Sequence, residues 1–150
     1  MVRGNPLLSI RADRPNISTG REAQVSVQHA VAAALVFGKV GLDQFTDACV
    51  RDGNVLELRS KVEVLRDESF STIAAAVEIT TADGRAHELV QMAARGSDVN
   101  PLSDRELEDK LRAAASGWNS RYDAAPLIDA IWTIDKSVDV AGLASLTVPG

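Results

Sequence analysis

The amino-acid sequence predicts an α+β fold, in which a small antiparallel sheet packs with helices and further helices follow. Three observations carry this prediction. Residues 25–37 are uncharged and rich in alanine, which is typical of a helix. Residues 73–81 alternate apolar and polar side chains, as strands do, and Ser103-Asp-Arg-Glu106 is a capping box that opens a helix. The order is strand, helices, three strands, helices, which differs from the alternating order of a parallel α/β sheet.

Length, composition and charge bound the class of protein. The chain has 150 residues, 45% of them hydrophobic, and a net charge of −5. Its basic residues are scattered, which argues against nucleic-acid binding, and no apolar run reaches the roughly 18 residues of a membrane helix. The N-terminal residues lack the apolar core of a signal peptide. With one cysteine and two histidines, we expect a cytoplasmic protein without an intrachain disulfide or a metal site.

The first third of the chain is predicted to hold a short strand, a loop and a long helix. Residues 6–12 form the predicted strand and residues 13–20 the loop after it. Ser26 is the predicted N-cap of the helix, and Gly38 ends it in the left-handed conformation. The apolar residues of this helix point in all directions, so we expect the helix to be buried on every side.

The middle of the chain changes from helical to strand periodicity. Residues 42–50 are predicted to form a helix that ends at Asp52-Gly53, and Asn54 to cap a shorter one that reaches residue 60. Strand alternation begins near residue 61, and a hairpin follows, with strands at residues 73–81 and 86–92.

The hairpin loop, Ala82-Asp-Gly84, leaves two registers open. A two-residue loop would place Val77 opposite Val90, whereas a three-residue loop with a left-handed Gly84 would place Val77 opposite Leu89. We favour the three-residue loop, because Ala-Asp-Gly suits a type I turn closed by a bulge.

Helices dominate the end of the chain, and we divide it into a lid-like α+β domain at residues 1–102 and C-terminal helices at residues 103–150. The helix opened by Ser103 is expected to stop at Gly117, and Asp123 is expected to cap the next one. A short helix over residues 138–146 and a tail ending in Pro149-Gly150 complete the chain. The predicted buried residues of the first two helices are Leu107, Leu111, Ala114, Trp118, Leu127, Ile128, Ile131 and Trp132.

The first turn of the alanine-rich helix contains the candidate site. Gln28 and His29 are polar residues in a helix that is otherwise apolar, and buried polar groups need partners or a ligand. The helix dipole disfavours a further positive charge there and so favours a neutral imidazole, which can act as a general base. The amides of the same turn could hold one carboxylate, and a nearby arginine (Arg11, Arg14 or Arg21) another.

The alternative for His29 is a core histidine whose ring bonds to a backbone carbonyl. Perturbed histidines are often structural, and the residues by themselves favour this alternative. Cys49 is predicted to be a small core residue.

Three segments, in order, resemble the C-terminal part of the MmgE/PrpD family. Residues 19–35 (Thr-Gly-Arg-Glu-Ala-Gln-Val-Ser-Val-Gln-His-Ala-Val-Ala-Ala-Ala-Leu) are similar to the family's TG-x-E-A stretch and the SxPY motif that follows it. Residues 38–47 are similar to the segment after that helix. Residues 100–111, which begin Asn-Pro-Leu-Ser, are similar to the family's NPL motif with its following Glu-Leu.

The resemblance implies a cofactor-independent lyase or isomerase that acts on small polycarboxylates, as 2-methylcitrate dehydratase, cis-aconitate decarboxylase and iminodisuccinate epimerase do. It also implies a homodimer whose active site lies between a helical domain and an α+β lid. This chain would supply the lid and the helices that return to the helical domain, about the last third of such an enzyme. On that basis His29 becomes the expected catalytic residue, with Gln28, Ser26 and Arg14 expected to bind substrate.

The sequence departs from the family pattern in two ways, which bear on the expected reaction and on activity. His29 stands where the family has the tyrosine of SxPY, and Gln28 stands where it has the proline, which favours an epimerase-like reaction. The family's other catalytic His and Lys positions lie upstream of the segments matched here, so we expect the chain alone to be inactive. The competing hypothesis is a non-catalytic interaction or oligomerisation module, because apolar faces left exposed by a missing domain drive association.

Overall fold

The computed structural model describes residues 1–147 and confirms the α+β class. The chain forms two compact units, Met1–Pro101 and a second that begins at Leu102, each described here by itself. The first unit contains β1 (Val2–Gly4), α1 (Pro6–Ala12), α2 (Gly20–Ala23), α3 (Val27–Phe37), η1 (Leu42–Gln44), α4 (Asp47–Val50), α5 (Gly53–Arg59), β2 (Val64–Arg66), β3 (Ala75–Thr80) and β4 (Ala86–Gln91). The second contains α6 (Asp104–Trp118), α7 (Ala125–Trp132), η2 (Ile134–Lys136) and α8 (Ala141–Ser145).

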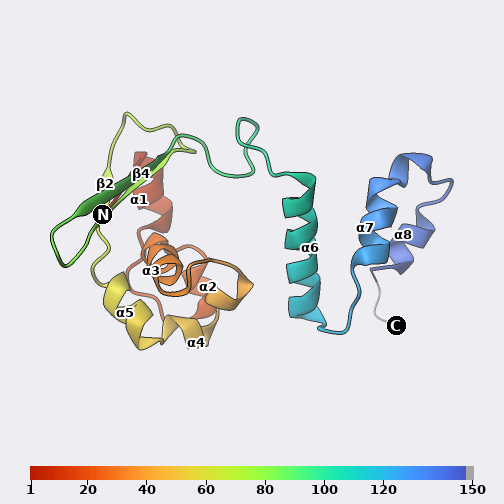
Figure 1. Cartoon of the computed structure of the whole chain (residues 1–150), viewed down its shortest axis with the longest axis horizontal. Helices are drawn as coiled ribbons and strands as arrows, with labels where there is room; N and C mark the ends of the chain where they lie inside the picture. The colour runs from red at the N-terminus through yellow and green to blue at the C-terminus, as the bar shows by residue number, and fades with distance from the viewer. Residues whose placement is uncertain (148–150) are drawn as a thin grey trace. The chain divides into compact units, whose positions relative to one another are not determined.

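The sheet of the first unit has the strand order β2-β1-β3-β4. Helix α1 lies beside this sheet (Figure 1). The sheet is mixed, because β1 pairs with β2 in parallel and with β3 in antiparallel fashion, whereas the sequence predicted a small antiparallel sheet. The sequence prediction missed β1, since three residues at a chain end carry no readable alternation. Helices α1 to α5 lie between β1 and β2, which is the long connection that a parallel pair requires.

The hairpin formed by β3 and β4 has the predicted three-residue register. Val77 pairs with Leu89, and Thr80 pairs with Ala86. The Gly84 amide donates to the Thr81 carbonyl at 2.9 Å, and Gly84 has a φ of 82°, the left-handed conformation that the loop requires.

The predicted strand over residues 6–12 is wrong, because this segment is α1. Asn5 is its N-cap, with the Asn5 side chain accepting a hydrogen bond from the Leu7 amide at 3.0 Å, and Pro6 occupies the first turn. Both are helix-start signals, since proline lacks only an amide hydrogen that would be unbonded there in any case. In this seven-residue segment, the N-cap and the proline outweigh the strand-like composition.

Helix α3 has the predicted ends but only one buried side. Ser26 is the N-cap, and Gly38 closes the helix with a φ of 69°. The buried residues Gln28, His29, Ala32 and Ala33 form one stripe, whereas Leu35 and Phe37 are exposed. The prediction of burial on every side is therefore wrong for the described chain. The buried stripe packs on α5. Ala32 and Ala33 of α3, Cys49 of α4 and Val55 of α5 form a hydrophobic core, which confirms the prediction that Cys49 is a core residue.

The predicted helix over residues 42–50 is divided into two short elements. The 3₁₀ turn η1 ends at Gln44, and α4 starts anew with Thr46 as its N-cap, whose hydroxyl accepts from the Cys49 amide at 3.2 Å. A threonine in this position competes with the helix backbone and favours a new start. Helix α5 is capped by Asp52, two residues earlier than the predicted Asn54.

In the second unit the positions of the helices agree with the prediction, but several residues predicted to be buried are exposed. Ser103 and Glu106 form the predicted capping box of α6, yet α6 has no buried residue in the described chain. Leu127 and Ile128 of α7 are buried. The N-cap of α7 is Ala124 and not the predicted Asp123, although the Asp123 carboxylate accepts from the Ala125 amide at 2.9 Å. The predicted burial is wrong for Leu107, Ala114, Trp118, Ile131 and Trp132, which are exposed. The short helix α8 lies in the predicted segment, and the predicted tail, Pro149-Gly150, lies outside the described residues.

Candidate functional site

The chain that leads into α3 is held by α2. Thr19 and Glu22 form a capping box at the start of α2, and hydrogen bonds from Ser18 and Thr19 lower the pKa of Glu22 to about 2. Gly20 packs so closely on α4 that a Cβ atom there would lie 2.3 Å from the Phe45 carbonyl oxygen. The Gly20 amide also donates to the Asp47 carboxylate at 2.7 Å. These contacts set the position at which α3 begins.

Ser26 is hydrogen-bonded to two other residues of the predicted site. Its hydroxyl accepts a hydrogen bond from the His29 amide at 3.2 Å, as an N-cap does, and donates to the Arg14 carbonyl at 2.7 Å. The bond between Ser26 and the His29 amide is buried, and the bond to the Arg14 carbonyl is partly buried. The loop before α2 is therefore attached directly to the first turn of α3.

Gln28 makes a second link to the same loop. Its side-chain oxygen accepts from the Arg14 amide at 3.1 Å, and its side-chain nitrogen donates to the Asp13 carboxylate. Gln28 is buried, so these partners meet the requirement of a buried amide. The role of Asp13 was missed, because nothing in a polar loop indicates which carboxylate will reach a helix start.

His29 is fully buried, and only one of its ring nitrogens has a partner in the described chain. Nε2 lies 2.7 Å from the Gln44 carbonyl oxygen at the end of η1. A carbonyl only accepts, so Nε2 carries the hydrogen and the lone pair of the neutral ring lies on Nδ1. Nδ1 is buried and has no hydrogen-bond partner within residues 1–147.

The other contacts of the imidazole are weak. The ring of Phe45 lies 6.0 Å from that of His29, between centroids, at an angle of 41°. The sulfur of Cys49 lies 3.9 Å from Nε2, and burial together with Asp52 raises the pKa of the Cys49 thiol. A thiol with a raised pKa is a poor nucleophile, which leaves Cys49 with its packing role.

The structure brings all four predicted site residues together, but Arg14 through its backbone. The exposed Arg14 guanidinium donates at 3.5 Å to the Ile10 carbonyl, while the Arg14 amide and carbonyl bind Gln28 and Ser26. Arg11 lies elsewhere, on the wall of a hollow beside α1, and Arg21 is exposed on α2.

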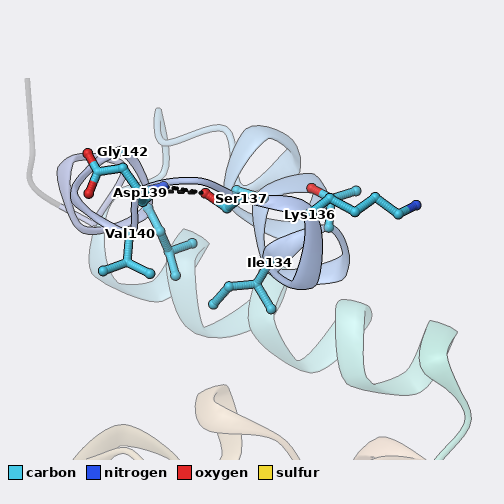
Figure 2. Close-up of a pocket in the computed structure, with 9 residues that line it drawn as sticks. Ile134, Lys136, Ser137, Asp139, Val140 and Gly142 are labelled. Atoms are coloured by element: carbon cyan, nitrogen blue, oxygen red, sulfur yellow. Dashed lines mark hydrogen bonds between the residues drawn. The ribbon is translucent and has the colours of Figure 1, made fainter.

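None of three surface hollows in the described chain is lined by His29. One of about 310 Å³ in the second unit is lined by α8 and the residues around η2. Figure 2 shows Ser137 bonded to the backbone of Asp139 there, with the Lys136 ammonium and the Asp139 carboxylate directed apart. Its charged groups do not converge, as a catalytic pocket would require.

Two further hollows differ in their lining. One of about 190 Å³ lies between α6 and α7 and is almost wholly apolar. Another of about 300 Å³ lies between α1 and residues 72–75. Within residues 1–147, no three His, Cys, Asp or Glu side chains gather as metal ligands, and no helix has the length and apolar character to cross a membrane.

The chain matches one protein family over most of its length. Residues 6–136 match the family of the MmgE/PrpD C-terminal domain. That range includes all four predicted site residues, the Thr19–Ala23 segment and the Asn100 motif.

Curated relatives agree with this match. The chain is 28% identical over 138 residues to the cis-aconitate decarboxylase of Homo sapiens and to that of Mus musculus. It is equally similar to the "cis-aconitate decarboxylase-like protein oryM" of Aspergillus oryzae. Each alignment covers 89% of this chain but only 28 to 29% of the relative's length.

Proposed function

The chain belongs to the MmgE/PrpD family, and we propose that it forms the C-terminal part of a cofactor-independent lyase or isomerase that acts on a small polycarboxylate. The names of the curated relatives favour decarboxylation of cis-aconitate or a similar acid over epimerisation. The complete enzyme is proposed to be cytoplasmic and homo-oligomeric, and the chain alone to be inactive, because it spans about 28% of those relatives.

The unpartnered Nδ1 atom of His29 is the observation that carries the proposal. A buried acceptor without a hydrogen bond is costly, and native proteins rarely keep one without a functional reason. The bond from Nε2 to the Gln44 carbonyl fixes the ring and leaves the Nδ1 lone pair to take a proton. In this proposal Nδ1 takes up a proton, and after the C–CO2 bond of the substrate breaks and CO2 leaves, it delivers that proton to the carbanion that remains.

The polar first turn of α3 supplies the carboxylate site in this proposal. Gln28 already donates to a carboxylate, that of Asp13, which supports the ability of its side-chain amide to hold one. The amides of the first helical turn add a positive field, as helix starts do for anions. Because His29 and Gln28 are buried, substrate entry requires the loop at residues 13–18 to move.

The test needs an enzyme of full length. This chain, fused in place of the equivalent C-terminal part of the human cis-aconitate decarboxylase, gives a chimera whose turnover of cis-aconitate can be measured. We expect His29→Ala to lower kcat by about 100-fold or more, the typical contribution of a general base. His87→Ala is the matched control, because His87 is the other histidine and lies exposed on β4.

Two further variants separate catalysis from folding. His29→Gln leaves an amide that can still bond to the Gln44 carbonyl but cannot take a proton, and we expect it to fold and to be inactive. His29→Tyr introduces the residue of the family's SxPY motif, and we expect it to retain part of the turnover. Full turnover by a folded His29→Gln chimera would refute the catalytic role of His29.

An interaction module is the second candidate function. Leu107, Ile131 and Trp132 are exposed around the apolar hollow between α6 and α7, and exposed apolar patches of this kind favour association. Under this alternative the chimera has no turnover, whereas the chain itself associates. A monomer at high concentration in light scattering contradicts this alternative. Turnover by the chimera distinguishes the two candidates, because the isolated chain exposes the same apolar residues under both.

A further inference from the structure

A second site lies beside α1, in the hollow of about 300 Å³ that shares no residue with the first turn of α3. Its walls are formed by α1 on one side and by the segment before β3 on the other, with Ala94 at the edge. Most of this lining is aliphatic: Leu7, Leu8, Ala12, Ile73, Ala74 and Ala75. Leu7 and Ile73 are exposed to solvent, so the walls have no cover from the described chain.

Arg11 is the only charged side chain in the lining. The Arg11 guanidinium makes no hydrogen bond or ion pair within residues 1–147. Arg3, by contrast, forms ion pairs with Asp67 and Glu88. An unpaired guanidinium presents a planar fork of donors that matches a carboxylate. The hollow therefore combines one positively charged side chain with aliphatic walls.

The Asn5 side chain and two carbonyls near Arg11 are already hydrogen-bonded. The Asn5 side chain is occupied, because it accepts from the Leu7 amide and donates to the Phe70 carbonyl at 2.9 Å. Two carbonyls at the end of α1 are also occupied: that of Ile10 by the Arg14 side chain and that of Ala12 by the Arg14 amide. The repulsion that free carbonyls at a helix end would exert on an anion is therefore reduced.

We propose that this hollow binds a short-chain aliphatic monocarboxylate, with the carboxylate on Arg11 and the hydrocarbon chain between α1 and residues 72–75. Apolar walls with one oriented polar group are typical of small-molecule sites, and about 300 Å³ is at the small end of their range. A polycarboxylate fits poorly, because its second charge would lie against aliphatic carbon without a partner. The ligand class therefore differs from the polycarboxylates of the proposed function.

Titration of the chain itself with three probes tests this proposal. Hexanoate carries both the charge and the hydrocarbon chain, 1-hexanol only the chain, and propane-1,2,3-tricarboxylate only charges. We expect hexanoate to bind more tightly than either of the others in isothermal titration or ligand-observed NMR. Equal binding of hexanoate and hexanol, tighter binding of the tricarboxylate, or no binding of hexanoate would overturn the proposal.

Matched variants locate the bound molecule. Arg11→Gln removes the guanidinium and should weaken hexanoate binding about tenfold or more, as loss of a charge-assisted bidentate contact does. Arg21→Gln removes an exposed arginine outside the hollow and should leave hexanoate binding unchanged. Ala94→Phe fills the exposed edge of the hollow and should weaken both hexanoate and hexanol.

Equal loss in the Arg11 and Arg21 variants would mean that net charge governs binding, and this outcome overturns the site. Unchanged binding in Ala94→Phe would place the molecule elsewhere and also overturns it. All of these measurements record binding to the chain and need no turnover. Failure of the proposed lyase or isomerase function would therefore leave this test intact.

Discussion

The carboxylate of Glu22 is held at the start of α2 by the amides and hydroxyls of Ser18 and Thr19. These bonds favour the ionised form, which is why the pKa falls from an ordinary 4.5 to about 2. A lowered folded-state pKa stabilises the fold above the unfolded pKa, and this contribution is lost as the pH falls toward the folded value.

A prediction for the pH dependence of stability follows from this residue. The difference in unfolding free energy between the wild type and Glu22→Gln should be greatest above about pH 4.5 and should shrink as the pH falls toward 2. Urea denaturation at several pH values measures it. Glu68→Gln, at an exposed position of the same unit, is the control. A difference that does not change with pH would contradict the prediction.

Gly20 is a second residue whose type is fixed by its surroundings. A methyl group there would collide with the backbone at Phe45 and Thr46, which can move only by separating α2 from α4. We expect Gly20→Ala to cost at least the ~1–3 kcal/mol typical of overpacking.

Gly53 provides the matched comparison for Gly20. It lies at the start of α5, and nothing lies within 4 Å of a Cβ placed there. Gly53→Ala should therefore be neutral or stabilising by up to about 1 kcal/mol, because alanine loses less backbone entropy on folding. Thermal unfolding of both variants tests the pair, and similar melting temperatures would contradict it.

At the scale of single elements, α6 depends on local interactions more than the other long helix does. It has 15 residues and none of them is buried, whereas α3 contributes a stripe of buried residues to the core. The start of α6 therefore depends largely on the Ser103–Glu106 capping box. In this box the Ser103 amide donates to the Glu106 carboxylate at 2.8 Å.

This dependence predicts a sensitive cap. Ser103→Ala should destabilise α6 by about 1 kcal/mol, the usual cost of losing a serine N-cap. Ser116→Ala, within the same helix and exposed, should be neutral or slightly stabilising, because alanine has the higher helix propensity. Amide hydrogen exchange of the α6 residues separates the two variants. Equal protection in both would mean that packing, not the cap, holds the helix.

At the scale of the whole molecule, the exposed apolar side chains are the main feature. Large apolar residues are exposed in both units, among them Leu35 and Phe37 on α3 and Leu107 and Ile131 in the second unit. The chain also spans less than a third of its curated relatives. Both facts support our proposal that this chain is one part of a larger enzyme.

This reading predicts association of the chain in solution. The double variant Leu107→Lys with Ile131→Lys places charges at the hollow between α6 and α7 and should lower the mass found by light scattering. Ile10→Lys, an exposed apolar position on α1, is the control for the effect of added charge. A wild type that stays monomeric at high concentration would contradict the prediction.

The sequence by itself determined the features that depend on neighbouring residues. The α+β class, both ends of α3, the capping box of α6 and the register of the β3–β4 hairpin were read correctly, because caps and tight turns involve residues only a few positions apart. The Asn5-Pro6 start of α1 was equally local, and there the prediction gave too much weight to strand-like composition.

Only the tertiary structure decided what depends on distant partners. The parallel pairing of β1 with β2, the burial of one side of α3 and the contacts of Gln28 with Asp13 and Arg14 join residues far apart or held by irregular loops. The same is true of His29, whose type and helix position are visible in the sequence. That one ring nitrogen bonds to the Gln44 carbonyl and the other lacks a partner depends on how η1 folds against α3, and no local pattern encodes this contact.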